Sequence, residues 1–299
     1  MESFLLLVVC FALGVALRFG NVVDEKGPAA LNAVIIFMAL PALALVHGHR
    51  LHIGAGLLLP AAMPWIVFGV GYGLFSLAGR FFGLDRKTVV CLTIVAGLGN
   101  TSFVGVPMIE AFFGPEHIGV GMLIDQAGTF AVLAVPGIAL AARASGQGCD
   151  WRSLTRKVLL FPPFAALLLG IALQPVSYPE WLTALLERLG STLAPLALLS
   201  VGMTLRPGQI RSNGRELAIG LGYKLILAPA LILVLYMGLL GQADTVARIT
   251  VFEAAMGPMI TGGIIAMTYG LNPSLAAALV GVGIPLSFLT IPAWYWVVR

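Results

Sequence analysis

The chain has 299 residues, of which 59% are hydrophobic and only 10% are charged. A soluble domain carries about 25% charged residues, so this composition excludes an ordinary water-soluble surface and indicates a membrane protein. The formal net charge of +4 is small. The sequence has no Walker motif, no nucleophilic triad and no basic patch joined to aromatic residues, which argues against an enzyme and against a nucleic-acid partner.

Ten apolar stretches run along the chain, most of them near or above the roughly 20 residues that a helix needs to cross the hydrocarbon core. We predict an all-α membrane protein whose ten transmembrane helices span residues 3–19, 29–47, 54–79, 88–113, 116–142, 156–174, 181–205, 216–240, 243–269 and 273–298. The connections between them are too short to fold alone. A soluble catalytic or nucleotide-binding domain is therefore excluded.

Lys and Arg residues are divided unevenly between the two sides of the predicted membrane. Of the 17 residues, twelve lie in the loops after the first, third, fifth and seventh helices: Arg18, Lys26, Arg80, Arg86, Lys87, Arg143, Arg152, Arg156, Lys157, Arg206, Arg211 and Arg215. Positively charged loops stay in the cytoplasm. The sequence thus predicts a multi-pass protein of the plasma membrane, the inner membrane in bacteria, with both termini facing outward.

The two halves of the chain are similar in sequence pattern. Thr88 of the first half corresponds to Thr245 of the second, and Gly105 corresponds to Gly262. The predicted parts are a first five-helix repeat, a cytoplasmic linker and a second five-helix repeat: 1–142, 143–155 and 156–299. A unit with five helices enters the membrane the second time from the opposite face, so the repeats are inverted, as in many secondary transporters.

The fourth and ninth predicted helices are interrupted by glycine and proline, over residues 97–107 and 256–263. Proline removes a backbone donor and glycine relaxes the backbone. Backbone groups freed at membrane depth cost several kcal/mol each unless protein or water satisfies them. Breaks at corresponding places in two repeats therefore predict a binding site, although two simple kinks are the alternative.

New half-helices are expected to begin after these breaks, near Val106 and Met259. Their free N–H groups and the positive end of the helix dipole attract anions, which predicts a carboxylate substrate at the crossover. The candidate substrate-binding residues are Asn100, Thr101, Ser102, Gly105, Pro107, Gly257, Pro258 and Thr261. Helix capping or bonding to the backbone is the alternative role for the polar side chains among them.

Asp125, Lys224 and Glu253 are charged residues that lie inside predicted spans. Glu253 is expected in the last turn of the first half of helix nine, where burial and the helix dipole both disfavour a lone carboxylate. It must hold a proton or have a cation beside it, which makes it the first candidate for proton or sodium coupling. Lys224 either pairs structurally with one of the two carboxylates or separates from it when a substrate or proton arrives.

His47, His49 and His52 cluster in the predicted loop after the second helix. Three histidines could bind zinc, but no acidic or cysteine ligand lies nearby in the sequence, so we favour a solvated loop and predict no metal and no cofactor. The three cysteines, Cys10, Cys91 and Cys149, are not placed for an extracellular disulfide.

The residues around the first break resemble a known family. The run from Asn100 to Pro107, followed by Phe113-Gly114, resembles the fourth-helix signature of the auxin efflux carrier family in its bacterial branch, within the superfamily of the bile acid:sodium symporters. Further similarity covers essentially the whole chain. In helix nine the family often has a Pro-Pro-Ala type sequence, whereas this chain has Gly257-Pro258-Met259.

This resemblance implies a fold and a function. The fold would be ten helices in two inverted five-helix repeats, with broken, crossed helices four and nine. Helices one, two, six and seven would form a scaffold, and helices three to five and eight to ten a moving core. Family members carry small organic anions such as malate, malonate or auxin.

The sequence therefore predicts a secondary transporter that moves a small mono- or dicarboxylate by alternating access at the crossover of helices four and nine. A cation-coupled symporter of the bile-acid type, and a channel or receptor on the same scaffold, are the alternatives. The expected partners are the organic anion and membrane lipid. The sequence does not fix the oligomeric state, and a homodimer is one of the options.

Overall fold

The structure is a computed structural model that describes the chain except residues 1, 25, 52–56, 147–155, 157–158 and 204–212. Over the described residues it is helical, apart from turns and one isolated antiparallel bridge between Gly99 and Pro258. The predicted all-α class is thereby confirmed. Several residues singled out in the sequence lie outside the described part: His52, Cys149, Arg152, Lys157, Arg206 and Arg211.

The first half of the chain consists of helices that are partly continuous with one another. In chain order they are α1 (Glu2–Phe19), α2 (Gly27–Val34), η1 (Ile35–Ala39), α3 (Leu40–Arg50), α4 (Leu58–Phe82), α5 (Arg86–Val95), η3 (Thr101–Gly105), α6 (Val106–Phe113), η4 (Pro115–His117), α7 (Ile118–Leu123), η5 (Ile124–Phe130), η6 (Leu133–Gly137) and α8 (Ile138–Ala144).

The second half has a similar succession of long and interrupted helices. They are α10 (Pro162–Ala172), α11 (Glu180–Gly190), α12 (Leu193–Met203), α13 (Gly214–Gly222), η8 (Tyr223–Leu227), α14 (Ala228–Ile232), η9 (Leu233–Leu239), α15 (Thr245–Ala254), α16 (Ile260–Thr268) and α17 (Pro273–Val298).

Six helices of the described chain are long and apolar enough to cross a membrane: Gly27–Arg50, Leu58–Phe82, Pro115–Ala144, Glu180–Met203, Gly214–Leu239 and Pro273–Val298. Shorter apolar helices cover Val8–Phe19, Thr101–Phe113 and Pro162–Ala172. A multi-pass membrane protein is consistent with these lengths. The number of ten spans and the inverted repeats stay predictions.

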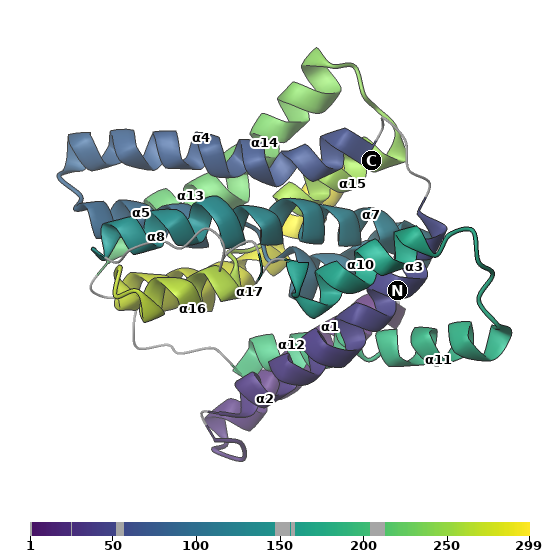
Figure 1. The fold of residues 1–299 in the computed structure, drawn as a ribbon. Coiled ribbons are helices and arrows are strands. Elements are labelled where there is room, and N and C mark those ends of the chain that lie inside the picture. The colour runs from purple at the N-terminus through teal and green to yellow at the C-terminus, as the bar shows by residue number, and fades with distance from the viewer. Residues whose placement is uncertain (1, 25, 52–56, 147–155, 157–158, 204–212) are drawn as a thin grey trace.

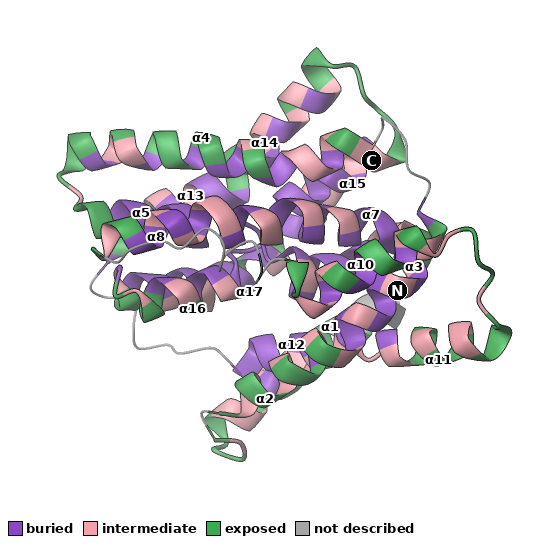
Figure 2. Cartoon of the chain, in the orientation of Figure 1, coloured by how far each residue is buried: buried purple, intermediate pink, exposed green. Residues whose placement is uncertain are grey.

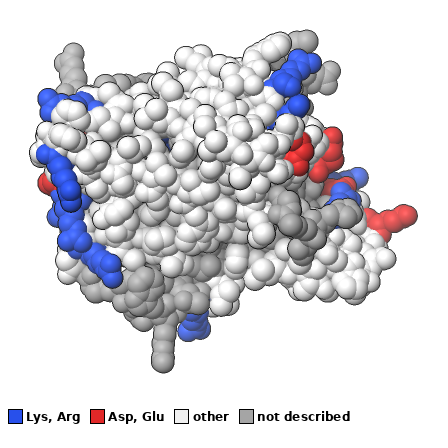
Figure 3. All heavy atoms as spheres, turned by 90° about the horizontal axis from the view of Figure 1, so that it is seen from above, with Lys and Arg blue, Asp and Glu red and all other residues white. Residues whose placement is uncertain are grey.

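Charged side chains gather at the ends of the helix bundle. Figure 1 shows most helices running between its left and right ends, with both termini at the right end. Seen from above, Lys and Arg side chains predominate at the left end and both signs of charge occupy the right end, with a mostly uncharged surface between them (Figure 3). Arg86 and Lys87, at the start of α5, are exposed at the left end. Such a surface between charged ends is what a bilayer requires.

Some helical turns are wide, because each N–H bonds to the carbonyl five residues earlier instead of four. One such turn is η8, and Pro229 follows it. A proline lacks an N–H and its ring crowds the carbonyl four residues earlier, so the regular hydrogen bond to that carbonyl is lost. For Pro229 this carbonyl belongs to Leu225, and the indole Nε1–H of Trp294 donates to it at 2.8 Å. A side chain thus replaces the missing backbone donor.

Two pairs of helices approach each other closely through glycines. α1 packs along α12, where a Cβ added at Gly202 would overlap the Phe11 carbonyl oxygen. α3 packs along α10, where a Cβ at Gly170 would lie 2.7 Å from the Leu45 carbonyl oxygen. Small residues at helix contacts are typical of membrane proteins. Around this group, α4, α5 and α13 to α17 pack mainly on one another. Figure 2 shows the purple, buried positions concentrated where these helices face each other.

Candidate functional site

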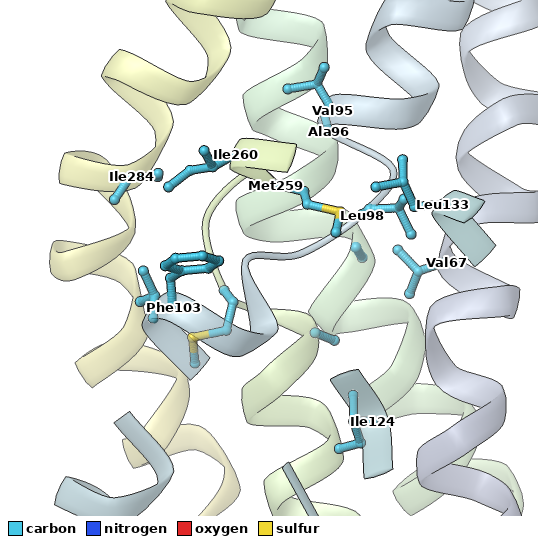
Figure 4. Close-up of a cluster of buried hydrophobic side chains, with 14 of the residues drawn as sticks. Val67, Val95, Ala96, Leu98, Phe103, Ile124, Leu133, Met259, Ile260 and Ile284 are labelled. Atoms are coloured by element: carbon cyan, nitrogen blue, oxygen red, sulfur yellow. The ribbon is translucent and has the colours of Figure 1, made fainter. Parts of the chain in front are cut away.

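Two helices are interrupted inside the bundle, and their interruptions cross. α5 ends at Val95 and helix resumes at Thr101, whereas α15 ends at Ala254 and α16 begins at Ile260. Figure 4 shows the two connecting segments passing each other, with the apolar side chain of Leu98 among those packed around them. The predicted breaks in the fourth and ninth helices are therefore present.

The crossing segments satisfy each other's backbone groups. The Asn100 N–H donates to the Gly257 carbonyl at 2.8 Å, and the Met259 N–H donates to the Val95 carbonyl at 3.0 Å. These bonds flank the isolated bridge described above. Because unpaired backbone groups at membrane depth are costly, this mutual pairing explains how two extended segments persist in the interior.

The first new half-helix begins earlier than the sequence predicted. η3 starts at Thr101 and not near Val106, because the Asn100 side-chain oxygen accepts the Phe103 N–H at 3.2 Å and caps the helix. Pro107 consequently lies inside the continuous helix formed by η3 and α6. The wide turn of η3 lies directly before Pro107. Such a turn tolerates proline, which has no backbone N–H for the regular helical hydrogen bond. The second half-helix begins directly after Met259, close to its predicted start.

Both halves place an aspartate cap at the start of the helix that leads to the break. Asp85 accepts the Thr88 N–H at 2.9 Å, and Asp244 accepts the Ala247 N–H at 2.8 Å. Thr88 is the third residue of α5, whereas Thr245 is the first residue of α15. Aligning the two capping aspartates therefore gives a register different from the one that pairs Thr88 with Thr245. The aspartates are the better guide, because a capping hydrogen bond fixes a residue's position in its helix and a shared residue type does not.

The carboxylate of Asp125 in η5 is buried and satisfied by three side chains. Thr101 Oγ1 donates to it at 2.5 Å, Ser102 Oγ at 2.8 Å, and Gln126 Nε2 at 2.5 Å. These bonds tie η5 to the start of the first new half-helix. They also occupy the hydroxyl hydrogens of Thr101 and Ser102, which the sequence suggested as donors to a substrate.

Glu253 lies in the last turn of α15, as predicted, and its side chain is 0% exposed. Neither of its carboxylate oxygens has a hydrogen-bond partner. Two glycines face the carboxylate: a Cβ added at Gly105 would overlap it, and one at Gly121 would lie 3.7 Å from Oε1. A buried carboxylate without partners is stable only if a proton or a cation neutralises it.

The close contact between Gly105 and Glu253 provides a testable prediction. In Gly105→Ala the new methyl group would overlap the Glu253 carboxylate, so we expect at least about a tenfold loss of transport rate with about 1–3 kcal/mol of destabilisation from overpacking. Proteoliposome uptake and thermal unfolding measure the two effects. Gly73→Ala is the matched control, because a Cβ there has nothing within 4 Å. Wild-type uptake by Gly105→Ala would show that the carboxylate has room to move aside.

Lys224 in η8 is buried and contacts the end of α15. Its Nζ donates to the Ala254 carbonyl at 2.8 Å. This carbonyl has no helical donor, because Ala254 is the last residue of α15 and the chain is no longer helical four positions later. No ion pair joins Lys224 to Glu253 or to Asp125 in the part of the chain that the structure describes. The direct pairing considered from the sequence is thus replaced by a bond to the backbone.

A cavity of about 10 Å³ lies beside Lys224 and Glu253, and its volume is about enough for one water molecule. Its lining includes Lys224, Glu253, Thr101 and Thr129, with the backbone of residues 97–99. Lys224 and Glu253 therefore border the same small cavity, which the apolar side chains of Met63 and Val67 also line.

Further buried polar atoms in this part of the bundle have no hydrogen-bond partner among the described residues. They are Asn100 Nδ2, Gln126 Oε1 and Thr129 Oγ1. The sequence analysis missed Gln126 and Thr129. A usable signal was present, because Asp125 and Thr129 are four residues apart and so share one face of an otherwise apolar helix.

The remaining predicted residues of the second break have other surroundings. Pro258 forms the bridge with Gly99. Gly257 packs against α17, where an added Cβ would lie 2.9 Å from Ser287 Oγ. Thr261 lies in the first turn of α16 and lines neither the small cavity nor the larger one described next.

A cavity of about 850 Å³, here called the vestibule, lies between α3, α6, α7, α11 and α12. Its lining includes Val106 and Pro107, which directly follow Gly105 and so connect it with the surroundings of Glu253. It belongs to the end of the bundle where α3 ends and both termini lie (Figure 1).

Titratable side chains also line the vestibule: His47, Arg50, Glu110, Glu116 and Glu187. Arg50 and Glu187 form an ion pair at 2.8 Å. His47 and His49 lie in the last turn of α3 and not in a loop, because the helix continues to Arg50. His49 stacks on Tyr178.

Comparison with known proteins places the chain in a family. A family model described as "Membrane transport protein" matches residues 1–147 and 151–295. The chain belongs to this family of membrane transport proteins. The match confirms the resemblance to the auxin efflux carriers that the sequence predicted, and it identifies the chain as a transporter.

Relatives extend over nearly the whole chain. An uncharacterised transporter of Methanothermobacter thermautotrophicus is 25% identical over 98% of this chain and 96% of its own length. An uncharacterised transporter of Methanocaldococcus jannaschii is 24% identical over 99% of this chain and 98% of its own length. A protein of Rhizobium meliloti with the name "Putative malonate transporter" is 26% identical over 93% of this chain and 90% of its own length.

Proposed function

We propose that this family member is a secondary carrier for a small organic anion, a mono- or dicarboxylate, and that the anion binds at the crossover of the two broken helices. The observation that carries the proposal is the buried amide nitrogen of Asn100, which has no partner and lies at the start of η3. Helix starts attract anions through free N–H groups and the dipole. An amide donor adds a specific hydrogen bond without the cost of burying a charge.

The helix packing supports alternating access as the mechanism. We propose that α1 to α3 and α10 to α12, joined by the close glycine contacts, act as the scaffold and that the remaining helices move as the core. The vestibule lies between helices of both groups. Movement of the core against the scaffold would close the vestibule and expose the crossover to the other side.

The substrate class is a small carboxylate, and malonate is the first compound to test. The name of the Rhizobium meliloti relative supports this choice. We further propose that the end with both termini faces outward, since positively charged loops stay in the cytoplasm.

Counterflow of radioactive malonate in proteoliposomes tests the carrier proposal. We expect unlabelled internal malonate to accelerate the entry of external label, because a carrier returns to the outside faster with substrate bound. Protein-free liposomes are the control, and related mono- and dicarboxylates extend the panel. Absence of counterflow for every acid would contradict a carrier. Entry that is independent of internal substrate would indicate a channel.

A further inference from the structure

The end of α15 offers several oxygen atoms of the kind that bind a small cation. The Ala254 carbonyl ends α15 and has no helical donor, and it accepts from a side chain instead. The two carboxylate oxygens of Glu253 have no partner, and the hydroxyl oxygen of Thr129 beside the same cavity also has none. In transporters with broken helices, unwound carbonyls and the C-terminal ends of half-helices bind Na⁺ or a proton.

A cation is already present at this place. The Lys224 ammonium bonds to the Ala254 carbonyl at 2.8 Å and lines the cavity together with Glu253. Gly99 lies opposite the ammonium and leaves room for it. A Cβ added at Gly99 would lie 3.2 Å from Nζ. An ammonium group has three N–H donors, and the bond to Ala254 uses one of them. The other two are available for the cavity.

We infer that the crossover contains a site for a small monovalent cation and that the Lys224 ammonium occupies it as a tethered replacement for a free ion. The position of Lys224 on η8 explains why this ion cannot leave: its side chain belongs to a helix packed in the same group as α15. The wild-type protein therefore has no need of sodium. Removing the ammonium opens the site to a free alkali cation, because Glu253 would otherwise be left without a neighbouring positive charge.

Thermal unfolding of purified protein in sodium, potassium or choline chloride at equal ionic strength tests this inference. For wild type we expect the same Tm in all three salts. For Lys224→Ala we expect a lower Tm in choline and a saturable, sodium-selective rise of at least about 3 °C, because a ligand that binds only the folded state stabilises it. Lys87→Ala is the control, since Lys87 is an exposed lysine in the first turn of α5.

A second set of variants separates the site from general salt effects. Lys224→Ala combined with Glu253→Gln removes the carboxylate, and the sodium response should disappear. If Lys224→Ala does not fold, Lys224→Gln fills the space without a charge and should respond in the same direction. A sodium-selective rise in wild type, or no selectivity in either neutral variant, would overturn the inference.

The inference rests on the proposed carrier function only for its consequence in transport. The unfolding measurement needs no substrate, so a sodium response of the variants would stand even if malonate counterflow failed. Conversely, counterflow by wild type together with sodium-insensitive Lys224 variants would retain the carrier and reject the tethered cation.

Discussion

Asn100→Asp is expected to abolish high-affinity substrate binding while leaving the fold intact. Aspartate caps a helix about as well as asparagine, so the bond to the Phe103 N–H, 3.2 Å in the wild type, is retained. The Nδ2 donor, which is buried and unpartnered, is replaced by an oxygen that repels a carboxylate. A hydrogen bond to a charged group is worth about 1.5–3 kcal/mol, so the apparent Kd should rise at least about 100-fold once repulsion is included.

Equilibrium binding of radioactive malonate and thermal unfolding measure the two expectations. Asn100→Ala removes both the cap and the donor, so it should weaken binding about tenfold and also cost about 1 kcal/mol of stability. Asn272→Asp is the control for malonate binding, because Asn272 caps α17 by accepting the Leu275 N–H at 3.2 Å and its Nδ2 donates to Thr88 Oγ1 at 3.1 Å, at the start of α5. An unchanged malonate affinity in Asn100→Asp would limit Asn100 to its capping role.

The breaks could be predicted from the sequence because they depend on local chemistry. Glycine and proline alter the backbone wherever they occur, and their positions in two helices were enough to locate the crossover. The start of the first half-helix was predicted too late, near Val106, since Pro107 was taken as the break. The Asn100 cap and the wide turn of η3 let the helix begin at Thr101, and neither is visible in the pattern of prolines.

The partners of the charged residues could not be predicted in the same way, because they depend on packing between distant segments. Asp125 was considered as a partner for Lys224, but three uncharged side chains satisfy it. The bond from Lys224 to Ala254 depends on α15 ending at Ala254, which leaves that carbonyl without a helical donor, and on η8 lying beside the end of α15. The sequence contains the first condition but not the second.

Glu253→Gln is expected to remove the dependence of uptake on an imposed ion gradient. Glutamine has nearly the same volume but resembles the protonated acid, so the variant is fixed in one charge state. If the Lys224 ammonium fills the cation site, the proton is the ion through which the Glu253 carboxylate responds. Wild-type malonate uptake should then change with an imposed pH gradient and not with a sodium gradient. The variant should respond to neither.

Counterflow without any gradient provides the internal check, because exchange of substrate requires binding and movement but no coupling. Glu253→Gln should keep counterflow within about a factor of three of wild type, since the binding donors at Asn100 and the helix start are unchanged. Glu180→Gln, an exposed change in the first turn of α11, should behave as wild type throughout. A pH dependence that survives in Glu253→Gln would assign coupling to another group, and loss of counterflow would place Glu253 in substrate binding.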